Sequence, residues 1–162
     1  MKLIVCASKN WGIGKNNDLL FSLPQDMKFF RETTTGKVVV MGRKTLESFP
    51  NQKPLPNRIN IVLSSSEKES SDNLIYVKSP QDAIELSKNY PDKDVFIIGG
   101  GKIYDLFLPY TDTALITKVL EDADADTYLH DFDSDPDFYL ANQSEDIEDN
   151  GHIIRFCEYK RK

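Results

Sequence analysis

Two runs of large apolar residues constrain the fold of this chain more than any other feature. Residues 38–41 read Val-Val-Val-Met and residues 95–98 read Val-Phe-Ile-Ile, with no polar residue in either run. A strand that is exposed on one face alternates apolar and polar residues, so these runs predict strands buried on both faces. Strands of this kind are typical of a largely parallel sheet with helices packed on each side.

Shorter patterns predict an alternation of strands and helices along the rest of the chain. Runs rich in β-branched residues predict strands, and amphipathic stretches with a capping residue or a proline at their start predict helices. The predicted strands cover residues 2–7, 37–41, 58–63, 74–77, 95–98, 114–120, 138–141 and 153–159, and the predicted helices cover 24–34, 43–49, 80–87 and 102–108. No repeat or linker interrupts this order, so we expect one α/β domain spanning residues 1–162.

The composition is that of a globular domain. With 40% apolar and 28% charged residues, and 8 Gly and 8 Pro, the chain is neither disordered, collagen-like nor membrane-spanning. The two cysteines, Cys6 and Cys157, are too few for a multi-bridge secreted scaffold, and we expect both thiols to be reduced. The first predicted strand begins at residue 2, which leaves no room for a secretion signal, so we expect a cytoplasmic protein.

Charge is spread unevenly along the chain. The net charge is −6, yet residues 119–154 contain twelve Asp or Glu and no Lys or Arg, so the remainder carries an excess of positive charge. This distribution disfavours general nucleic-acid binding and leaves room for a small anionic ligand at the basic part. A solvated acidic face explains the acidic segment equally well.

Three predicted strand ends carry groups that suit phosphate. They are Gly42-Arg43-Lys44-Thr45, Ser64-Ser65-Ser66 and Gly99-Gly100-Gly101-Lys102. In open parallel sheets, ligands bind beyond the carboxyl ends of the strands, where backbone N–H groups, hydroxyls and cations can meet an anion. Each segment alone is a weak signal, but three in one small chain favour a dinucleotide. Their basic and hydroxyl groups suit the 2′-phosphate of NADP better than the ribose of NAD.

The spacing excludes the two familiar phosphate motifs. A P-loop needs glycine five positions before Gly42, where this chain has Lys37. The Rossmann fingerprint needs a third glycine where this chain has Tyr104. The chain is therefore predicted to be neither a P-loop NTPase nor a standard Rossmann enzyme.

Asp26 lies in the first turn of the helix predicted at residues 24–34. A carboxylate there can simply complement the helix dipole. Met27 and Phe30, however, place an apolar surface on the same side of the helix. A carboxylate beside such a surface could bind a ligand with two parallel N–H donors, and its pKa is open to perturbation. The preceding loop, residues 10–20, is either a simple connector or a flexible segment that closes over the site.

Five ordered blocks resemble dihydrofolate reductases of the bacterial type. The blocks are Trp11-Gly12-Ile13-Gly14, Leu23-Pro24-Gln25-Asp26, Val40-Met41-Gly42-Arg43-Lys44-Thr45, Pro54-Leu55-Pro56-Asn57-Arg58 and Ile97-Ile98-Gly99-Gly100-Gly101-Lys102-Ile103-Tyr104. The resemblance runs over nearly the whole chain. It implies a mostly parallel, mixed sheet of eight strands with about four helices, and hydride transfer from NADPH to 7,8-dihydrofolate to give tetrahydrofolate.

The resemblance also implies the substrate site. Asp26 would bind the N3 and 2-amino edge of the pterin and favour protonation of N5, with water as the immediate donor. Thr117 would hydrogen-bond both Asp26 and the pterin, and Arg58 would bind the glutamate α-carboxylate. The implied catalytic residues are Asp26, Leu19, Phe21 and Thr117, and the implied substrate-binding residues are Ile4, Val5, Asp26, Met27, Phe30, Phe49, Leu55, Arg58, Ile98 and Thr117.

The implied cofactor site lies at the nicotinamide and the phosphates of NADPH. Its residues are Cys6, Ala7, Ile13, Gly14, Leu19, Gly42, Arg43, Lys44, Thr45, Leu63, Ser64, Ser65, Lys78, Ile98, Gly99, Gly100, Gly101, Lys102, Ile103 and Tyr104. Leu19 would belong to a mobile loop over the cofactor, and Arg43 with Ser65 would reach the 2′-phosphate. Phe21 departs from the family pattern, because a tryptophan whose indole N–H holds a water usually occupies this position.

Other functions remain as alternatives. A pyrimidine reductase of flavin biosynthesis has a related fold and also uses NADPH, and a non-catalytic nucleotide-binding module would make Asp26 a plain helix-start acid. We expect no metal, because the Asp131, Asp133, Asp135 series has Pro136 where a calcium loop needs glycine. From the family we expect a monomer that supplies one-carbon carriers for thymidylate and purine synthesis, is inhibited by antifolates, and has no membrane or nucleic-acid partner.

Overall fold

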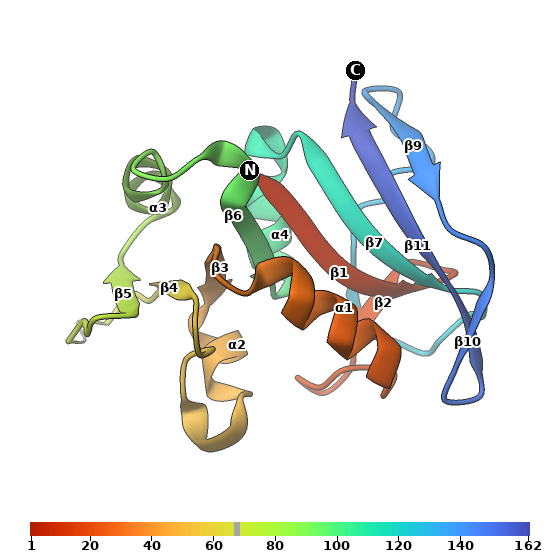
Figure 1. Ribbon diagram of the computed structural model, residues 1–162, viewed down its shortest axis with the longest axis horizontal. Coiled ribbons are helices and arrows are strands. Elements are labelled where there is room, and N and C mark those ends of the chain that lie inside the picture. Colours follow the sequence, from red (N-terminus) through yellow and green to blue (C-terminus); the bar gives the residue numbers. More distant parts are fainter. Residues whose placement is uncertain (67–68) are drawn as a thin grey trace.

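The computed structural model describes residues 1–66 and 69–162, and in this part of the chain one large mixed sheet forms the centre of the molecule (Figure 1). Eight strands follow the order β10-β11-β7-β1-β6-β3-β4-β5, and β9 adds a ninth strand by pairing with β11. The strands are β1 Lys2–Ser8, β3 Val38–Gly42, β4 Ile59–Leu63, β5 Leu74–Val77, β6 Val95–Gly99, β7 Thr113–Val119, β9 Phe138–Gln143, β10 Ile147–Asp149 and β11 His152–Arg161.

The sheet is parallel on one side and antiparallel on the other. Strands β7, β1, β6, β3, β4 and β5 are parallel to one another, whereas β11 runs antiparallel to β7, β9 and β10. The helices are α1 Pro24–Thr34, α2 Arg43–Glu47, α3 Pro80–Ser87 and α4 Gly101–Phe107, with 3₁₀ turns at Pro50–Gln52, Asp92–Asp94 and Leu108–Tyr110. This architecture confirms the predicted class, a mostly parallel α/β sheet with four helices.

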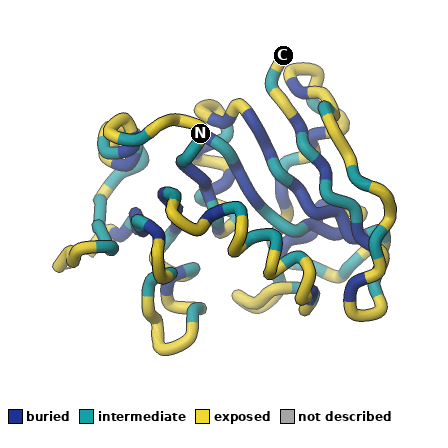
Figure 2. Tube along the Cα trace, in the orientation of Figure 1, coloured by how far each residue is buried: buried dark blue, intermediate teal, exposed yellow. Residues whose placement is uncertain are grey.

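The apolar run in β3 is buried on both faces, as the sequence predicts. Val39 and Val40 are both fully buried, yet they belong to two different hydrophobic clusters. One cluster packs under α3 and α4, through Ala83 and Phe107, and the other packs beneath α1 and α2. Figure 2 shows the central strands buried along most of their length, while the outward side of α1 is exposed. The sheet therefore separates two layers of core.

Most predicted boundaries lie within two residues of the observed ones. Helix α1 and helix α3 begin and end where the sequence predicts. Helix α2 ends at Glu47 instead of residue 49, and β9 extends to Gln143 instead of residue 141. Three short strands were not predicted, namely β10 and the separate pair formed by β2 Gly12–Gly14 and β8 Thr127–Tyr128.

The pair of strands β2 and β8 changes the interpretation of the loop at residues 10–20. Gly12 does not adopt a positive φ. A Cβ built on Gly12 would lie 2.8 Å from Cβ of Ala125 and 2.9 Å from Oγ of Ser8, so this position needs glycine because other residues approach it closely. The base of the loop is therefore held by the pairing of β2 with residues 127–128.

Among the described residues, no helix combines the length and the apolar character that a membrane span requires. Cys6 and Cys157 are both free thiols.

Candidate active site

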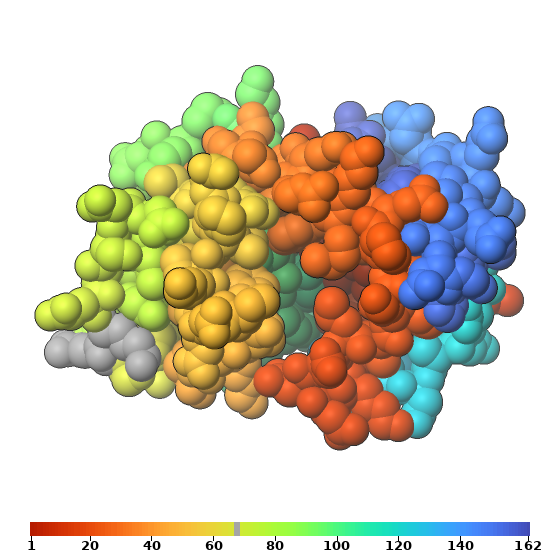
Figure 3. Space-filling model, turned by 60° about the horizontal axis from the view of Figure 1, so that its bottom comes forward, coloured from red at the N-terminus to blue at the C-terminus, as the bar shows by residue number. Residues whose placement is uncertain are grey.

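A cleft opens at the carboxyl ends of β1 and β6. It encloses about 460 Å³ and is lined by residues of β1, β6, α1, α2, α4 and the loop that precedes α1. Figure 3 shows this hollow between the segments around residues 10–30 and 40–60, with residues near the end of β6 at its floor. The position agrees with the rule that ligands bind beyond the carboxyl ends of parallel strands.

Asp26 projects into this cleft from the first turn of α1. Pro24 occupies the start of the helix, which places Asp26 two residues further on. The hydroxyl of Thr117, on β7, donates a 2.6 Å hydrogen bond to Oδ1 of Asp26. Thr117 lies beside Cys6 in the register of β7 and β1, so the carboxylate sits over two adjacent strands of the sheet. Helix α1 thus sets where this side chain originates, and the hydrogen bond from Thr117 of β7 sets its direction.

Burial raises the pKa of Asp26 above that of an ordinary aspartate. The hydrogen bond from Thr117 opposes this shift because it stabilises the ionised carboxylate, and the negative charge of Asp149 adds to it. Burial likewise raises the pKa of the Cys6 thiol, and the neighbouring Asp26 raises it further. Cys6 is therefore a neutral thiol beside the acid and a poor nucleophile.

The cleft has an apolar wall next to Asp26. Met27 and Phe30 from α1 line it together with Phe49, and Ile98 of β6 completes this part of the lining. Met27 is 54% exposed and Leu19, in the preceding loop, is 70% exposed, although both are large apolar side chains. Covering apolar surface of this kind makes the free energy of binding a flat ligand more favourable.

Arg58 lies near the opposite end of α1 from Asp26. Its Nη1 donates to Oγ1 of Thr34, the last residue of α1, at 3.1 Å, and its Nε donates to the carbonyl of Pro56 at 2.9 Å. Asp26 and Thr34 are eight residues apart on one helix, a rise of about 12 Å. Arg58 is only 7% exposed as a residue. Burial lowers the pKa of its guanidinium, and the positive charge of Arg31 lowers it further.

The glycine-rich end of β6 forms another part of the lining. A Cβ on Gly101 would meet Cγ2 of Thr127 at 2.4 Å, so packing within the protein requires glycine there. A Cβ on Gly100 would meet nothing closer than Oγ1 of Thr45, at 3.8 Å, so a side chain at this position would instead occupy the cleft. Behind them, the hydroxyl of Tyr104 donates to the carbonyl of Ile4 at 2.8 Å.

The structure brings most of the predicted site residues together in this cleft. Those that line it are Ile4, Val5, Cys6, Ile13, Gly14, Leu19, Phe21, Asp26, Met27, Phe30, Lys44, Thr45, Phe49, Ile98, Gly99, Gly100, Gly101 and Tyr104. Those that do not line it are Ala7, Gly42, Arg43, Leu55, Arg58, Leu63, Ser64, Ser65, Lys78, Lys102, Ile103 and Thr117. Ala7 is fully buried, whereas Arg43 is exposed and forms an ion pair with Glu47 at 2.9 Å.

Sequence reasoning missed several lining residues. They are Lys15, Asn17, Asp18, Leu20, Leu23, Ser48, Pro50 and Thr127. Most belong to the loop before α1 or to the turn after α2, next to residues that were predicted. Thr127 has no local signal, because only its pairing with Gly14 brings it to the cleft.

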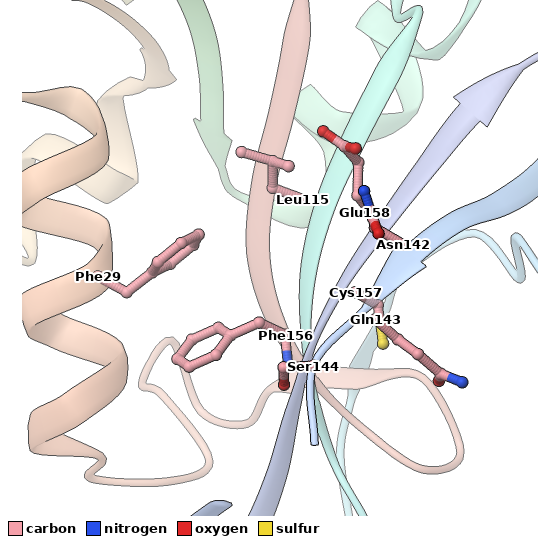
Figure 4. A pocket seen from close by; sticks show the side chains of 8 residues that line it. All are labelled: Phe29, Leu115, Asn142, Gln143, Ser144, Phe156, Cys157 and Glu158. Atoms are coloured by element: carbon pink, nitrogen blue, oxygen red, sulfur yellow. The ribbon is translucent and has the colours of Figure 1, made fainter. Parts of the chain in front are cut away.

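A second hollow lies on the other side of α1 and contains none of the predicted site residues. It encloses about 330 Å³ and is formed where Phe29 of α1 faces Phe156 of β11, with their ring centroids 4.6 Å apart (Figure 4). Leu115 and polar residues of β9 and β11 complete it. This hollow is shallow and lies against the antiparallel part of the sheet, so the cleft that contains Asp26 is the better candidate for an active site.

The fold and the cleft define an α/β protein whose candidate ligand site lies at the carboxyl ends of parallel strands. A model of the family described as dihydrofolate reductase matches residues 1–161. The chain therefore belongs to the dihydrofolate reductase family, as the resemblance predicted.

Similarity to individual dihydrofolate reductases supports this assignment. The chain is 32% identical to the dihydrofolate reductase of Bacillus subtilis (strain 168), over 100% of this chain and 95% of that protein. It is 33% identical to the dihydrofolate reductase of Ureaplasma parvum serovar 3, over 100% and 99% of the two chains. A solved structure of dihydrofolate reductase from Enterococcus faecalis, complexed with NADP(H) and RAB-propyl, matches with a TM-score of 0.86 and 26% identity, covering 99% of this chain and 95% of that one.

Proposed function

We propose that this protein transfers a hydride from NADPH to 7,8-dihydrofolate, giving 5,6,7,8-tetrahydrofolate, and that the cleft containing Asp26 is where this happens. The observation that carries the proposal is the half-buried carboxylate of Asp26, held by Thr117 and bordered by a large apolar surface. Membership of the dihydrofolate reductase family supports it independently.

The geometry along α1 supports the proposed substrate roles. The carboxylate of Asp26 offers two oxygens, which suit the parallel N–H donors on the N3 and 2-amino edge of a pterin. Met27, Phe30, Phe49 and Leu55 supply apolar surface between the two ends of the helix. In this proposal Arg58, whose guanidinium contacts Thr34 about 12 Å along α1 from Asp26, binds the α-carboxylate of the glutamate tail.

The residues at the other side of the cleft fit NADPH. Gly100 leaves the end of β6 open, where a side chain would occupy the cleft, and Lys44 and Thr45 offer a cation and a hydroxyl to phosphate oxygens. Arg43 and Ser65 are exposed near the ends of β3 and β4, which suits a 2′-phosphate. NADPH, when bound, supplies the hydride.

Asp26 also controls the proton that accompanies the hydride. Its raised pKa means that the carboxyl holds a proton more readily than an ordinary aspartate does. Bound to the pterin edge, Asp26 favours a proton on N5, which water delivers. Leu19 and Phe21 shield the reacting atoms from bulk solvent, as expected of apolar side chains at the mouth of a cleft.

A steady-state assay tests the function. Purified protein should oxidise NADPH only when dihydrofolate is present, should prefer NADPH to NADH, and should be inhibited by an antifolate. Binding of NADPH without turnover would instead favour a non-catalytic nucleotide-binding module. Turnover of a pyrimidine substrate in place of dihydrofolate would favour a pyrimidine reductase, although the residues from Leu23 to Phe30 argue against it.

The cellular setting is part of the same proposal. We infer a cytoplasmic monomer that supplies one-carbon carriers for thymidylate and purine synthesis and that acts as an antifolate target. Size-exclusion chromatography with light scattering tests the oligomeric state.

A further inference from the structure

Helix α1 does not cap its own N-terminus. Leu23 occupies the N-cap position, and no side-chain hydrogen bond from it reaches the helix. Pro24 has no N–H, so the first turn contains two N–H groups that need an acceptor, those of Gln25 and Asp26. Their partner must come from elsewhere in the chain.

Both N–H groups donate to one oxygen of Asp149, at the end of β10. The distances to Oδ2 are 3.0 Å from Gln25 and 3.2 Å from Asp26. Asp149 is only 3% exposed, so its side chain makes this contact away from solvent. One buried carboxylate therefore satisfies both N–H groups of Gln25 and Asp26.

Neighbouring residues of the same hairpin reinforce the contact. The side-chain amide of Gln25 donates to the carbonyl of Glu148 at 2.7 Å, and the amide of Asn150 donates to the carbonyl of Ser22 at 2.8 Å. The turn between β10 and β11 thus holds the start of α1 on both sides of Asp149.

We propose that Asp149 is a positioning residue for Asp26: its buried carboxylate caps α1 from the C-terminal hairpin and fixes where the Asp26 side chain enters the cleft. This inference rests on the proposed role of Asp26 in the reduction of dihydrofolate. It assigns a part in catalysis to a hairpin that contributes no residue to the lining of the cleft.

The charge of Asp149 adds a second effect. It raises the pKa of Asp26, in the same direction as burial. The other groups that interact with Asp26 are the hydroxyl of Thr117, the neutral thiol of Cys6 and the buried phenol of Tyr104. The hydrogen bonds from Thr117 and Cys6 both lower the pKa of Asp26. Asp149 is the residue among these whose carboxylate repels the ionised form of Asp26.

Two substitutions separate the geometric effect from the electrostatic one. In Asp149→Asn the side-chain oxygen can still accept from both N–H groups, but the charge is gone. We expect the rate at low pH to stay near that of the wild type, while the alkaline limb of the kcat profile moves to lower pH because the pKa of Asp26 falls. Asp149→Ala removes the cap as well, and we expect kcat/KM to fall about tenfold.

Glu148→Gln is the matched control, since it removes an exposed charge one residue away and leaves the backbone carbonyl of Glu148 in place. We expect its profile to match the wild type. An Asp149→Asn profile superimposed on the wild-type profile, or an Asp149→Ala variant with the wild-type rate, would overturn the proposal. Asp26→Asn, measured alongside, separates failure of this inference from failure of the proposed function. If Asp26→Asn keeps full activity, the proposed function of Asp26 has failed. If Asp26→Asn is inactive while the Asp149 variants behave as the wild type, only the role of Asp149 is refuted.

Discussion

Thr117 donates a 2.6 Å hydrogen bond to Asp26 from a strand that lies 91 residues further along the chain. The bond stabilises the ionised carboxylate, so it holds the pKa of Asp26 below the value that burial alone would impose. Thr117 is 2% exposed, and the bond is therefore shielded from competing water.

Replacing Thr117 by valine should expose the effect of this bond. Valine has nearly the same shape but cannot donate, so the pKa of Asp26 should rise and the alkaline limb of the pH–rate profile should move to higher pH, opposite to the shift expected for Asp149→Asn. The lost bond to a charged group should also cost about 1–3 kcal/mol of stability. Thr113→Val, on the same strand, is the control and should leave the profile unchanged.

Replacing Asp26 by asparagine should reduce the rate of hydride transfer about 100-fold or more at neutral pH, the usual scale for a lost acid–base group. The loss should shrink in acid, where the substrate is already protonated at N5. Stopped-flow measurement across pH checks both parts. Glu32→Gln, on the exposed side of the same helix, controls for loss of charge on α1. Equal loss at every pH would contradict a role in proton control.

The same Asp26→Asn substitution should stabilise the protein without ligands. The pKa of Asp26 is higher in the folded state than in the unfolded state, so folding loses stability as pH rises through the folded pKa. Asparagine removes that cost, and the gain should be present at about pH 8 and vanish below the unfolded pKa of about 3.9. Thermal melting is the check, in which about 1 kcal/mol corresponds to roughly 2–4 °C.

Arg58→Lys should raise KM for dihydrofolate about tenfold with little effect on kcat, because lysine cannot bind a carboxylate through two parallel N–H groups. A dihydropterin that lacks the glutamate tail should be reduced equally well by both proteins. A KM that rises for both substrates would show that Arg58 acts through its bond to Thr34 instead.

Gly101→Ala should lower stability by about 1–3 kcal/mol, because the new Cβ would overlap Cγ2 of Thr127 at 2.4 Å. Thr127→Ser removes that methyl group and should restore most of the loss when the two substitutions are combined. A double-mutant cycle by chemical denaturation measures the coupling. Additive effects would mean that Thr127 is not what requires glycine at this position.

The elements with the strongest local sequence patterns were the ones that the sequence predicted correctly. The run from Val38 to Met41 predicted a strand buried on both faces, and the fold confirms it with neighbouring residues in separate cores. The pairing of β2 with β8 was missed because strands of three and two residues are too short to show a period. The cap on α1 was missed for another reason: nothing near Asp149 in sequence indicates that its partner lies 123 residues away.

The sequence alone determined the helices and the longer strands, since apolar periodicity, prolines and capping residues act over a few residues, and its ordered blocks determined the family. Tertiary structure decided what those residues do to one another. Only the folding of the sheet places Thr117 and Asp149 against Asp26, and only burial in that setting shifts the pKa of the acid, because desolvation and hydrogen bonding depend on neighbours in space.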